Sequence, residues 1–261
     1  MKIGLIGKGN LGKFLLDQLN VKMILPDLAI TALFDEREKS RESLKKLAAT
    51  YQCEPFYDLT SFLNSPIDLV VECATVDAVY SYAPKILQKK DMVVVSIGAL
   101  ADISFYEKIE EITKAKQTKL YLPAGAIGGL DAIQAASIMG GLESVTLMTR
   151  KPAKALGVES EDKFVLFDGP AKEAIQQFPQ NANVAITLSL AGLGVEKTRV
   201  RIIADPAIKQ NIHTIQATGE FGNLEFTFQN YSLPTNPKTS YLTALSLLST
   251  LKSLNKQIQI G

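Results

Sequence analysis

The feature that most constrains the fold is a glycine-rich turn between an apolar segment and an amphipathic one, close to the first residue of the chain. Lys2 to Ile6 has the continuous apolar character of a buried strand, and G-K-G-N-L-G follows at once. In this setting Gly7 permits a tight turn, Gly9 lets the backbone approach a pyrophosphate, and Gly12 permits close packing of a helix on a strand. The alternative is a tight turn that binds nothing. The residues predicted to contact a dinucleotide here are Gly7, Gly9, Asn10, Leu11 and Gly12.

An acidic residue follows the glycine turn at the distance expected of a ribose ligand. Asp35 ends the second apolar segment, close to the spacing of about 20 residues at which an acid binds the ribose hydroxyls of NAD. Arg37 is able to accept a 2′-phosphate, which Asp35 would repel. The pattern therefore favours NAD as the cofactor and leaves NADP open. A solvated charge cluster is the alternative explanation of Asp35.

The order of the segments predicts the fold class. Nearly continuous apolar strands alternate with amphipathic helices as far as residue 122, which is typical of a Rossmann-type doubly wound parallel sheet. Ligands bind at the carboxyl ends of such strands, so Cys73 and Ala74 are further candidates for cofactor contact. The strands are predicted at 2–6, 28–34, 69–73, 92–97 and 119–122, and the helices at 13–19, 40–51, 78–88 and 105–116.

After Pro123 the pattern changes to a second, smaller domain of α+β type. Three consecutive strand-like segments, at 198–204, 212–218 and 224–230, alternate apolar and polar residues as in an antiparallel sheet with one buried face. We therefore expect residues 1–122 to form the dinucleotide-binding domain, completed by a C-terminal helix at 237–261. Residues 123–236 are expected to form the substrate domain.

Two local groups of positive charge are candidates for anion binding. Asn236-Pro237 is predicted to start the last helix, with Asn as N-cap and Pro at the first helical position. Lys238 is an unfavourable cation in a first helical turn, so we expect Asn236, Lys238 and Thr239 to bind a substrate carboxylate. A lysine that points into solvent is the alternative. The segment R-K-P-A-K at 150–154 is interpreted as a solvated turn, with anion binding as its alternative.

His213 is the single histidine of the 261 residues. A lone histidine is commonly a surface or core residue, but an enzyme that transfers a hydride from an alcohol or an amine needs a proton acceptor near neutral pH. Strand alternation places Asn211, His213 and Ile215 on one face of a strand. His213 is therefore the predicted catalytic base.

Composition excludes several other functions. Lys and Arg total 28 against 27 Asp and Glu, so no net charge attracts nucleic acid or an anionic membrane. One His and two Cys cannot build a zinc cluster, and no metal site is expected. The chain has no apolar run long enough to cross a membrane, and it begins without a signal-peptide pattern. We expect a cytoplasmic protein with free thiols.

Several motifs in order along the chain resemble the L-aspartate dehydrogenase family. They are G-K-G-N-L-G, V-V-E-C-A, P-A-G-A-I-G-G-L-D-A, N-V-A, A-D-P-A-I-K-Q-N-I-H and N-P-K-T-S. The resemblance implies NAD(P)-dependent oxidative deamination of L-aspartate to iminoaspartate, then oxaloacetate and ammonia, by a homodimer. It also implies that His213 is the active-site histidine and that Ala126 and Asn183 contact the cofactor. The segment S-I-G-A-L-A-D departs from the family pattern, so no role is assigned to it.

Other interpretations stay open. A related enzyme of the same architecture could act on another small amino or semialdehyde acid, in the manner of a homoserine dehydrogenase. A dinucleotide sensor could keep the fold without the chemistry, although the intact His213 and N-P-K-T-S argue against it. For the dehydrogenase, hydrolysis of the imine on the enzyme and its transfer to a partner for nicotinamide biosynthesis both remain possible.

Overall fold

The computed structural model describes residues 1–178, 182–234 and 236–258, with the side chains of residues 182, 237 and 238 excepted. These residues form two compact units. The first comprises residues 1–123 together with 247–258, and the second comprises the described residues between 124 and 246. We describe each unit by itself.

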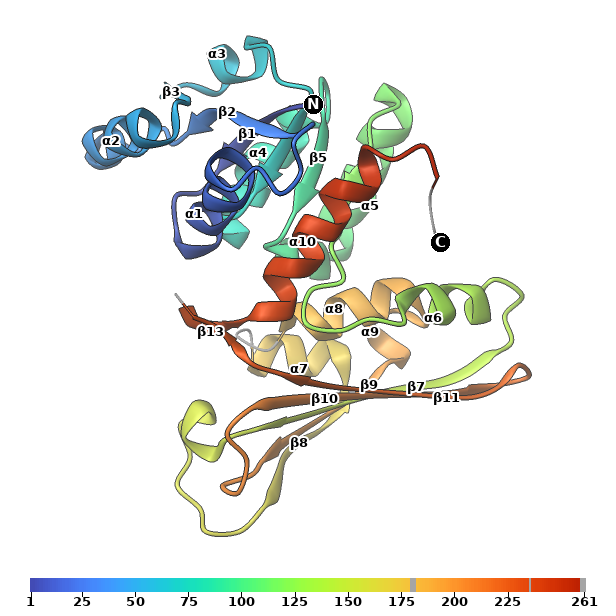
Figure 1. The fold of residues 1–261 in the computed structure, drawn as a ribbon. Coiled ribbons are helices and arrows are strands. Elements are labelled where there is room, and N and C mark those ends of the chain that lie inside the picture. Colours follow the sequence, from blue (N-terminus) through green and yellow to red (C-terminus); the bar gives the residue numbers. More distant parts are fainter. Residues whose placement is uncertain (179–181, 235, 259–261) are drawn as a thin grey trace. The chain divides into compact units, whose positions relative to one another are not determined.

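The first unit is built on a six-stranded parallel sheet with the order β3-β2-β1-β4-β5-β6 (Figure 1). Its central strands are apolar without interruption because helices cover both faces, as the sequence pattern predicts. The strands are β1 Lys2–Ile6, β2 Ala29–Phe34, β3 Glu54–Phe56, β4 Leu69–Glu72, β5 Asp91–Val94 and β6 Leu120–Tyr121. The order reverses between β1 and β4, which creates the switch point at which such sheets bind ligands.

Two groups of helices bury the two faces of this sheet. Leu15 of α1, Leu44 of α2 and Leu251 of α10 (Tyr241–Leu254) share one core with Ile3 and Leu5 of β1. On the opposite face Phe62 of α3 lies directly over Gly4, where there is no room for a larger residue. The helices of this unit are α1 Asn10–Leu16, α2 Arg41–Tyr51, α3 Leu59–Asn64, α4 Val76–Ile86 and α5 Ile103–Lys116, with short turns at Asp17–Val21, Glu38–Ser40 and Ile97–Ala101.

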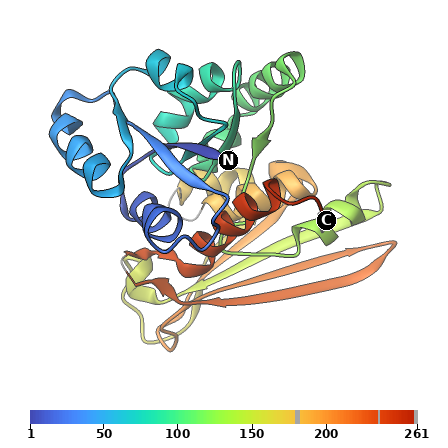
Figure 2. The same cartoon turned by 45° about the horizontal axis from the view of Figure 1, so that its top comes forward.

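The second unit is a five-stranded sheet with the order β11-β10-β7-β9-β8. Helices α6, α7, α8 and α9 lie over one face of it (Figure 1), and Figure 2 shows the long β10–β11 ribbon in orange. The strands are β7 Leu142–Lys151, β8 Phe164–Pro170, β9 Arg199–Ala204, β10 Asn211–Gly219 and β11 Gly222–Asn230. The helices are α6 Leu130–Ser137, α7 Ala171–Gln177, α8 Ala182–Ala191 and α9 Gly194–Lys197, with a short turn at Ala153–Leu156.

The second sheet is mixed, because it contains one parallel pair beside the antiparallel pairs that the alternating segments indicate. Strands β7 and β9 run parallel, whereas the pairs β10/β11, β10/β7 and β8/β9 are antiparallel. Between β7 and β9 the chain first forms β8, which runs antiparallel to β9, and then α7, α8 and α9. Strands β7 and β9 are thus neighbours in the sheet without being consecutive in the chain, and a long connection of this kind permits a parallel pair.

The predicted start of the last helix is wrong. Residues Asn236–Ser240 form strand β13, which pairs with β12 (Ser232–Leu233), and α10 runs from Tyr241 to Leu254. Ser240 rather than Asn236 caps the helix, since its Oγ accepts a hydrogen bond of 3.2 Å from the N–H of Leu242. The local cap signal at 236–237 is overridden by hairpin pairing.

None of the helices in the described ranges combines the length and the apolar character needed to cross a membrane.

Candidate functional site

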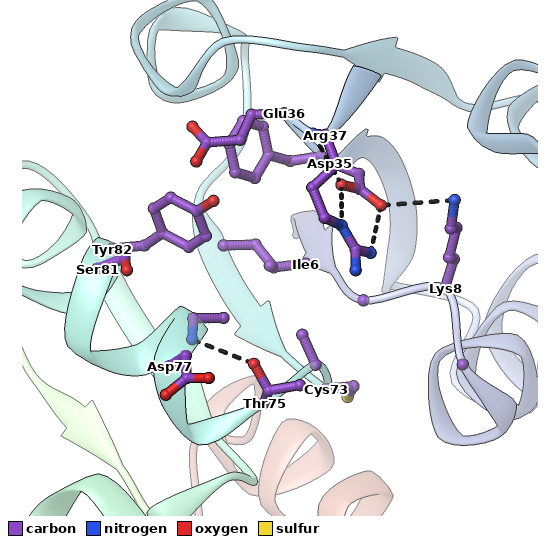
Figure 3. Close-up of a pocket in the computed structure, with 15 residues that line it drawn as sticks. Ile6, Lys8, Asp35, Glu36, Arg37, Cys73, Thr75, Asp77, Ser81 and Tyr82 are labelled. Carbon is purple, nitrogen blue, oxygen red and sulfur yellow. Dashed lines mark hydrogen bonds and ion pairs between the residues drawn. The ribbon is translucent and has the colours of Figure 1, made fainter. Parts of the chain in front are cut away.

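A pocket of about 680 Å³ opens at the carboxyl ends of β1, β2 and β4 in the first unit (Figure 3). This volume is in the range of small-molecule and cofactor sites. The sequence-predicted residues that the structure brings together in its lining are Gly7, Gly9, Asp35, Cys73 and Ala74. Thr75, which follows the predicted Cys73 and Ala74, also lines it, as do residues that sequence reasoning did not select, among them Lys8, Glu36, Asp77, Ser81 and Tyr82.

The glycine turn has the backbone that a dinucleotide site requires. Gly7 has φ of +109°, and a Cβ there would overlap the carbonyl of Cys73. A Cβ on Gly12 would overlap the carbonyl oxygen of Gly7, because helix α1 packs closely against β1. Gly9 differs, since a Cβ there would have no neighbour within 4 Å and would enter open space beside the pocket. The first two glycines shape the turn, and Gly9 keeps the approach to the pocket open.

The other predicted turn residues lie next to the pocket. Helix α1 begins at Asn10, three residues earlier than expected, with Gly9 as an N-cap that supplies no side-chain hydrogen bond. Asn10 is exposed, whereas Leu11 is partly buried against the core of the first unit. Neither residue is part of the pocket lining, so their cofactor contact stays a prediction.

Asp35 is held at the end of β2 by two cations (Figure 3). Arg37 donates from Nε to Oδ1 at 2.9 Å and from Nη2 to Oδ2 at 2.7 Å, and Lys8 Nζ lies 3.5 Å from Oδ2. Burial of the carboxylate opposes its ionisation, but the hydrogen bonds from Arg37 outweigh it and lower the pKa of Asp35 to about 2. Asp35 is therefore a fixed negative charge at the position expected of a ribose ligand.

Glu72 connects the two loops that follow β4 and β5. Its fully buried carboxylate accepts hydrogen bonds from the N–H of Ala74 at 2.5 Å, from the Oγ of Ser96 at 2.8 Å and from the N–H of Ser96 at 3.0 Å. A fourth comes from the N–H of Val95 at 3.3 Å. Burial raises the pKa of Glu72 against the effect of these donors. The carboxylate fixes the turn of Ala74 that lines the pocket.

His213 lies on the buried face of β10 in the second unit, 4% exposed. Its Nδ1 is 3.0 Å from the Oγ1 of Thr149, its partner in β7 across the sheet. Burial, together with the positive charge of Lys151, lowers the pKa of His213 to about 4. The imidazole is therefore neutral near pH 7, and Nε2 has no hydrogen-bond partner within the described part of the chain.

The glycine-rich segment after Pro123 packs on the same sheet. Asn230 of β11, which is buried, donates from Nδ2 to the carbonyl of Ala126 at 2.7 Å. Gly128 packs against the ring of Phe228, the β11 partner of His213. The segment is thus fixed in the second unit, and Ala126 is buried there.

The remaining predicted positions are separate from these clusters. Asn183 is exposed near the start of α8, and its carbonyl accepts a hydrogen bond from Thr187 Oγ1 at 2.9 Å. Asn236 donates from Nδ2 to Thr239 Oγ1 at 2.8 Å within β13, and the side chain of Lys238 lies outside the described residues. The helix N-terminus proposed as the reason for anion binding at Asn236, Lys238 and Thr239 is absent from that segment. Their role in substrate binding stays a prediction.

Sequence reasoning missed Thr149, Glu72 and Asn230. Thr149 could have been found only from its cross-strand pairing with His213, and this pairing follows from the register of β7 against β10. The sequence indicates Glu72 as a charged residue at the end of an apolar strand, and an acid buried at such a position needs several hydrogen-bond donors.

Comparison with known proteins agrees with this architecture. Residues 7–123 match the family model described as homoserine dehydrogenase, NAD binding domain, and residues 131–254 match the model described as aspartate dehydrogenase, C-terminal. The L-aspartate dehydrogenase of Methanosarcina acetivorans is 40% identical over 100% of this chain and 99% of the relative, and that of Methanosarcina mazei is 42% identical over the same shares. The crystal structure of aspartate dehydrogenase from Thermotoga maritima superposes with a TM-score of 0.80 and 32% identity, covering 100% of this chain and 99% of that one. On the strength of full-length similarity in both sequence and fold, this chain belongs to the L-aspartate dehydrogenase family.

Proposed function

We propose that the protein oxidises L-aspartate to iminoaspartate with NAD(P), followed by hydrolysis to oxaloacetate and ammonia. The observation that carries this proposal is the state of its single histidine, which is neutral and hydrogen-bonded to Thr149 in a chain that also has a dinucleotide pocket. Oxidation of an amine needs both a hydride acceptor and a proton acceptor. Family membership supports aspartate as the amine.

The pocket of the first unit fits a nicotinamide dinucleotide. The open space beside Gly9 accommodates the pyrophosphate, and the Asp35 carboxylate is placed to accept hydrogen bonds from the ribose hydroxyls. When bound, the nicotinamide ring supplies the acceptor for the hydride from Cα of aspartate. We propose Gly7, Gly9, Asn10, Leu11, Gly12, Asp35, Cys73, Ala74, Ala126 and Asn183 as its contacts. The ionised Asp35 favours NAD, and Lys8 with Arg37 makes NADP usable.

His213 performs the proton transfers in this proposal. In the proposed tautomer Nδ1–H donates to Thr149 Oγ1, and the Nε2 lone pair accepts a proton from the substrate amine. After that proton is released to solvent, the same nitrogen takes a proton from the water that attacks the imine carbon and passes it to the substrate nitrogen, which leaves as ammonia. The overall reaction consumes one water and one oxidised cofactor for each aspartate. Asn236, Lys238 and Thr239 are proposed to contact the substrate.

Initial rates test the substrate and cofactor assignments together. The protein is assayed with L-aspartate, L-homoserine and L-alanine, each against NAD and NADP. The proposal predicts reduced cofactor with L-aspartate at the highest kcat/KM. A higher value with L-homoserine would assign the chain to the alternative substrate class. Binding of NADH without turnover of any of the three would identify a dinucleotide sensor.

We further propose that the protein works as a homodimer in the cytoplasm. The two cysteines are free thiols, as expected of a reducing compartment. The outer face of the β7–β10 region carries Met148, Ile212 and Thr214, which alternate with the residues buried beneath the helices. Such a flat, partly apolar sheet face suits pairing with its copy around a two-fold axis. Light scattering after gel filtration should give twice the monomer mass of 28.4 kDa, and Met148→Glu should give the monomer.

A further inference from the structure

Lys151 shares the inner face of the second sheet with His213. It is the last residue of β7, two positions after Thr149, and side chains two apart in a strand project from the same face. Thr149 pairs with His213, and Ile212 pairs with Arg150, so Lys151 follows directly at the end of that ladder. The N–H of Asp205 donates to the carbonyl of Lys151 at 2.9 Å, which fixes its backbone.

The neighbouring cations have different environments. Arg150 projects from the opposite face and pairs with Asp205 at 2.6 Å. Lys154, in the short turn after β7, is exposed to solvent. Lys151 is partly buried, its pKa is lowered by desolvation, and its charge is close enough to lower the pKa of His213. The segment R-K-P-A-K is therefore no uniformly solvated turn, because one of its cations is directed to the His213 face.

A partly buried cation beside a catalytic base is unfavourable in free energy for two reasons. Desolvation disfavours the charged lysine, and its charge disfavours protonation of the imidazole. A substrate carboxylate bound at Lys151 would offset the effect of the lysine charge on His213. The proposed substrate has two carboxylates, one attached to Cα and the other to the neighbouring carbon, Cβ.

We propose that Lys151 binds a carboxylate of the dicarboxylic substrate and so places the substrate amine at Nε2 of His213. The inference rests on the proposed function for the identity of the substrate, but the binding of a dicarboxylate by Lys151 is testable without turnover. Lys151 is thereby a substrate-binding residue on the same sheet face as the base. Of the other two cations in the R-K-P-A-K segment, Arg150 pairs with Asp205 and Lys154 is solvated.

The test uses succinate, a dicarboxylate that lacks the amine and cannot be oxidised by this reaction. Succinate is titrated calorimetrically into the NADH-loaded protein, for the wild type and for Lys151→Met, Lys151→Arg and Lys154→Met. Methionine keeps the length of the stem and removes the charge. We expect succinate to bind about 10- to 100-fold more weakly to Lys151→Met, as for the loss of a charge-assisted hydrogen bond. Lys151→Arg should restore part of the affinity, and Lys154→Met should match the wild type.

A second readout separates binding from support of the fold. In Lys151→Met the KM for L-aspartate should rise by the same factor as the succinate Kd, and the pKa that governs kcat/KM should rise towards that of free imidazole. Wild-type succinate affinity in Lys151→Met, or no succinate binding by the wild type, overturns the inference even if L-aspartate is oxidised. If Lys151-dependent succinate binding is found without oxidation of L-aspartate, the proposed function fails and the inference stands.

Discussion

Thr149 and His213 face each other across two antiparallel strands, with Oγ1 and Nδ1 3.0 Å apart and both side chains buried. Strands hold such a pair more rigidly than loops do, because the ladder on either side fixes both backbones. The contact with the threonine hydroxyl holds the imidazole ring in one orientation, and when Nδ1 carries the proton the threonine oxygen accepts its hydrogen bond. Strand register thus sets the positions of the proposed base and of its hydrogen-bond partner.

Replacement of Thr149 tests this relationship. Thr149→Val keeps the shape but removes the oxygen, so Nδ1 of His213 is left without its hydrogen-bond partner and the ring is less firmly oriented. We expect kcat with L-aspartate to fall at least about tenfold, with the Kd of NADH unchanged. Thr149→Ser, which keeps the hydroxyl, should retain most of the activity. Equal kcat in the valine and serine variants would show that the hydroxyl does not orient the base.

The low pKa of His213 predicts a specific dependence of stability on pH. The folded value is about 4 against 6.5 for the free side chain, so between these values the unfolded chain binds more protons than the folded one. Stability should therefore be complete above about pH 6.5 and fall by up to about 3 kcal/mol as the pH drops towards 4. Urea unfolding at several pH values measures this slope. His213→Asn should flatten this slope. An unchanged slope in that variant would show that groups other than His213 cause the pH dependence of stability.

Two glycines of the turn should respond differently to substitution. A side chain at Gly9 meets no protein atom and enters the pocket, so Gly9→Val should abolish NADH binding while the melting temperature stays near that of the wild type. A Cβ at Gly12 would overlap the carbonyl of Gly7, so Gly12→Ala should destabilise the fold by about 1–3 kcal/mol. NADH fluorescence and thermal melts give the two readouts. Full NADH affinity in Gly9→Val would show that the pyrophosphate does not bind at this turn.

The charge at Asp35 should control the choice of cofactor. Its carboxylate repels a 2′-phosphate, whereas Lys8 and Arg37 beside it would attract one. Asp35→Ser removes the repulsion and leaves both cations, so the ratio of kcat/KM for NADP to that for NAD should rise at least about tenfold. In Arg37→Ala the same ratio should fall. An unchanged ratio in both variants would show that the adenosine ribose does not bind at the end of β2.

The parts of the fold that could be predicted from sequence are those set by local pattern. The uninterrupted apolar strands at Lys2–Ile6 and Leu69–Glu72 indicate burial on both faces, and this implies a parallel sheet with helices on either side. The glycine turn and Asp35 also follow from spacing along the chain, and the structure brings Gly7, Gly9 and Asp35 into one pocket.

The features that could not be predicted depend on pairing between distant segments. Asn236-Pro237 has the local signature of a helix start, but Leu233 pairs with Asn236 and the segment becomes a strand. Likewise the partner of His213 is 64 residues away, and only the register of β7 against β10 identifies it as Thr149. The short helix α3 was missed although Asp58 caps it, with Oδ1 accepting from the N–H of Ser61 at 2.8 Å.

The most direct test of the account is the rate of L-aspartate-dependent cofactor reduction by the wild type and by His213→Ala, with NADH affinity measured on the same samples. No second imidazole exists in the chain to replace the first. We predict turnover in the wild type, a loss of about 10²- to 10⁴-fold in kcat for His213→Ala, and the same Kd for NADH in both. Near-normal turnover in His213→Ala, with NADH affinity intact, would contradict the assignment of His213 as the base.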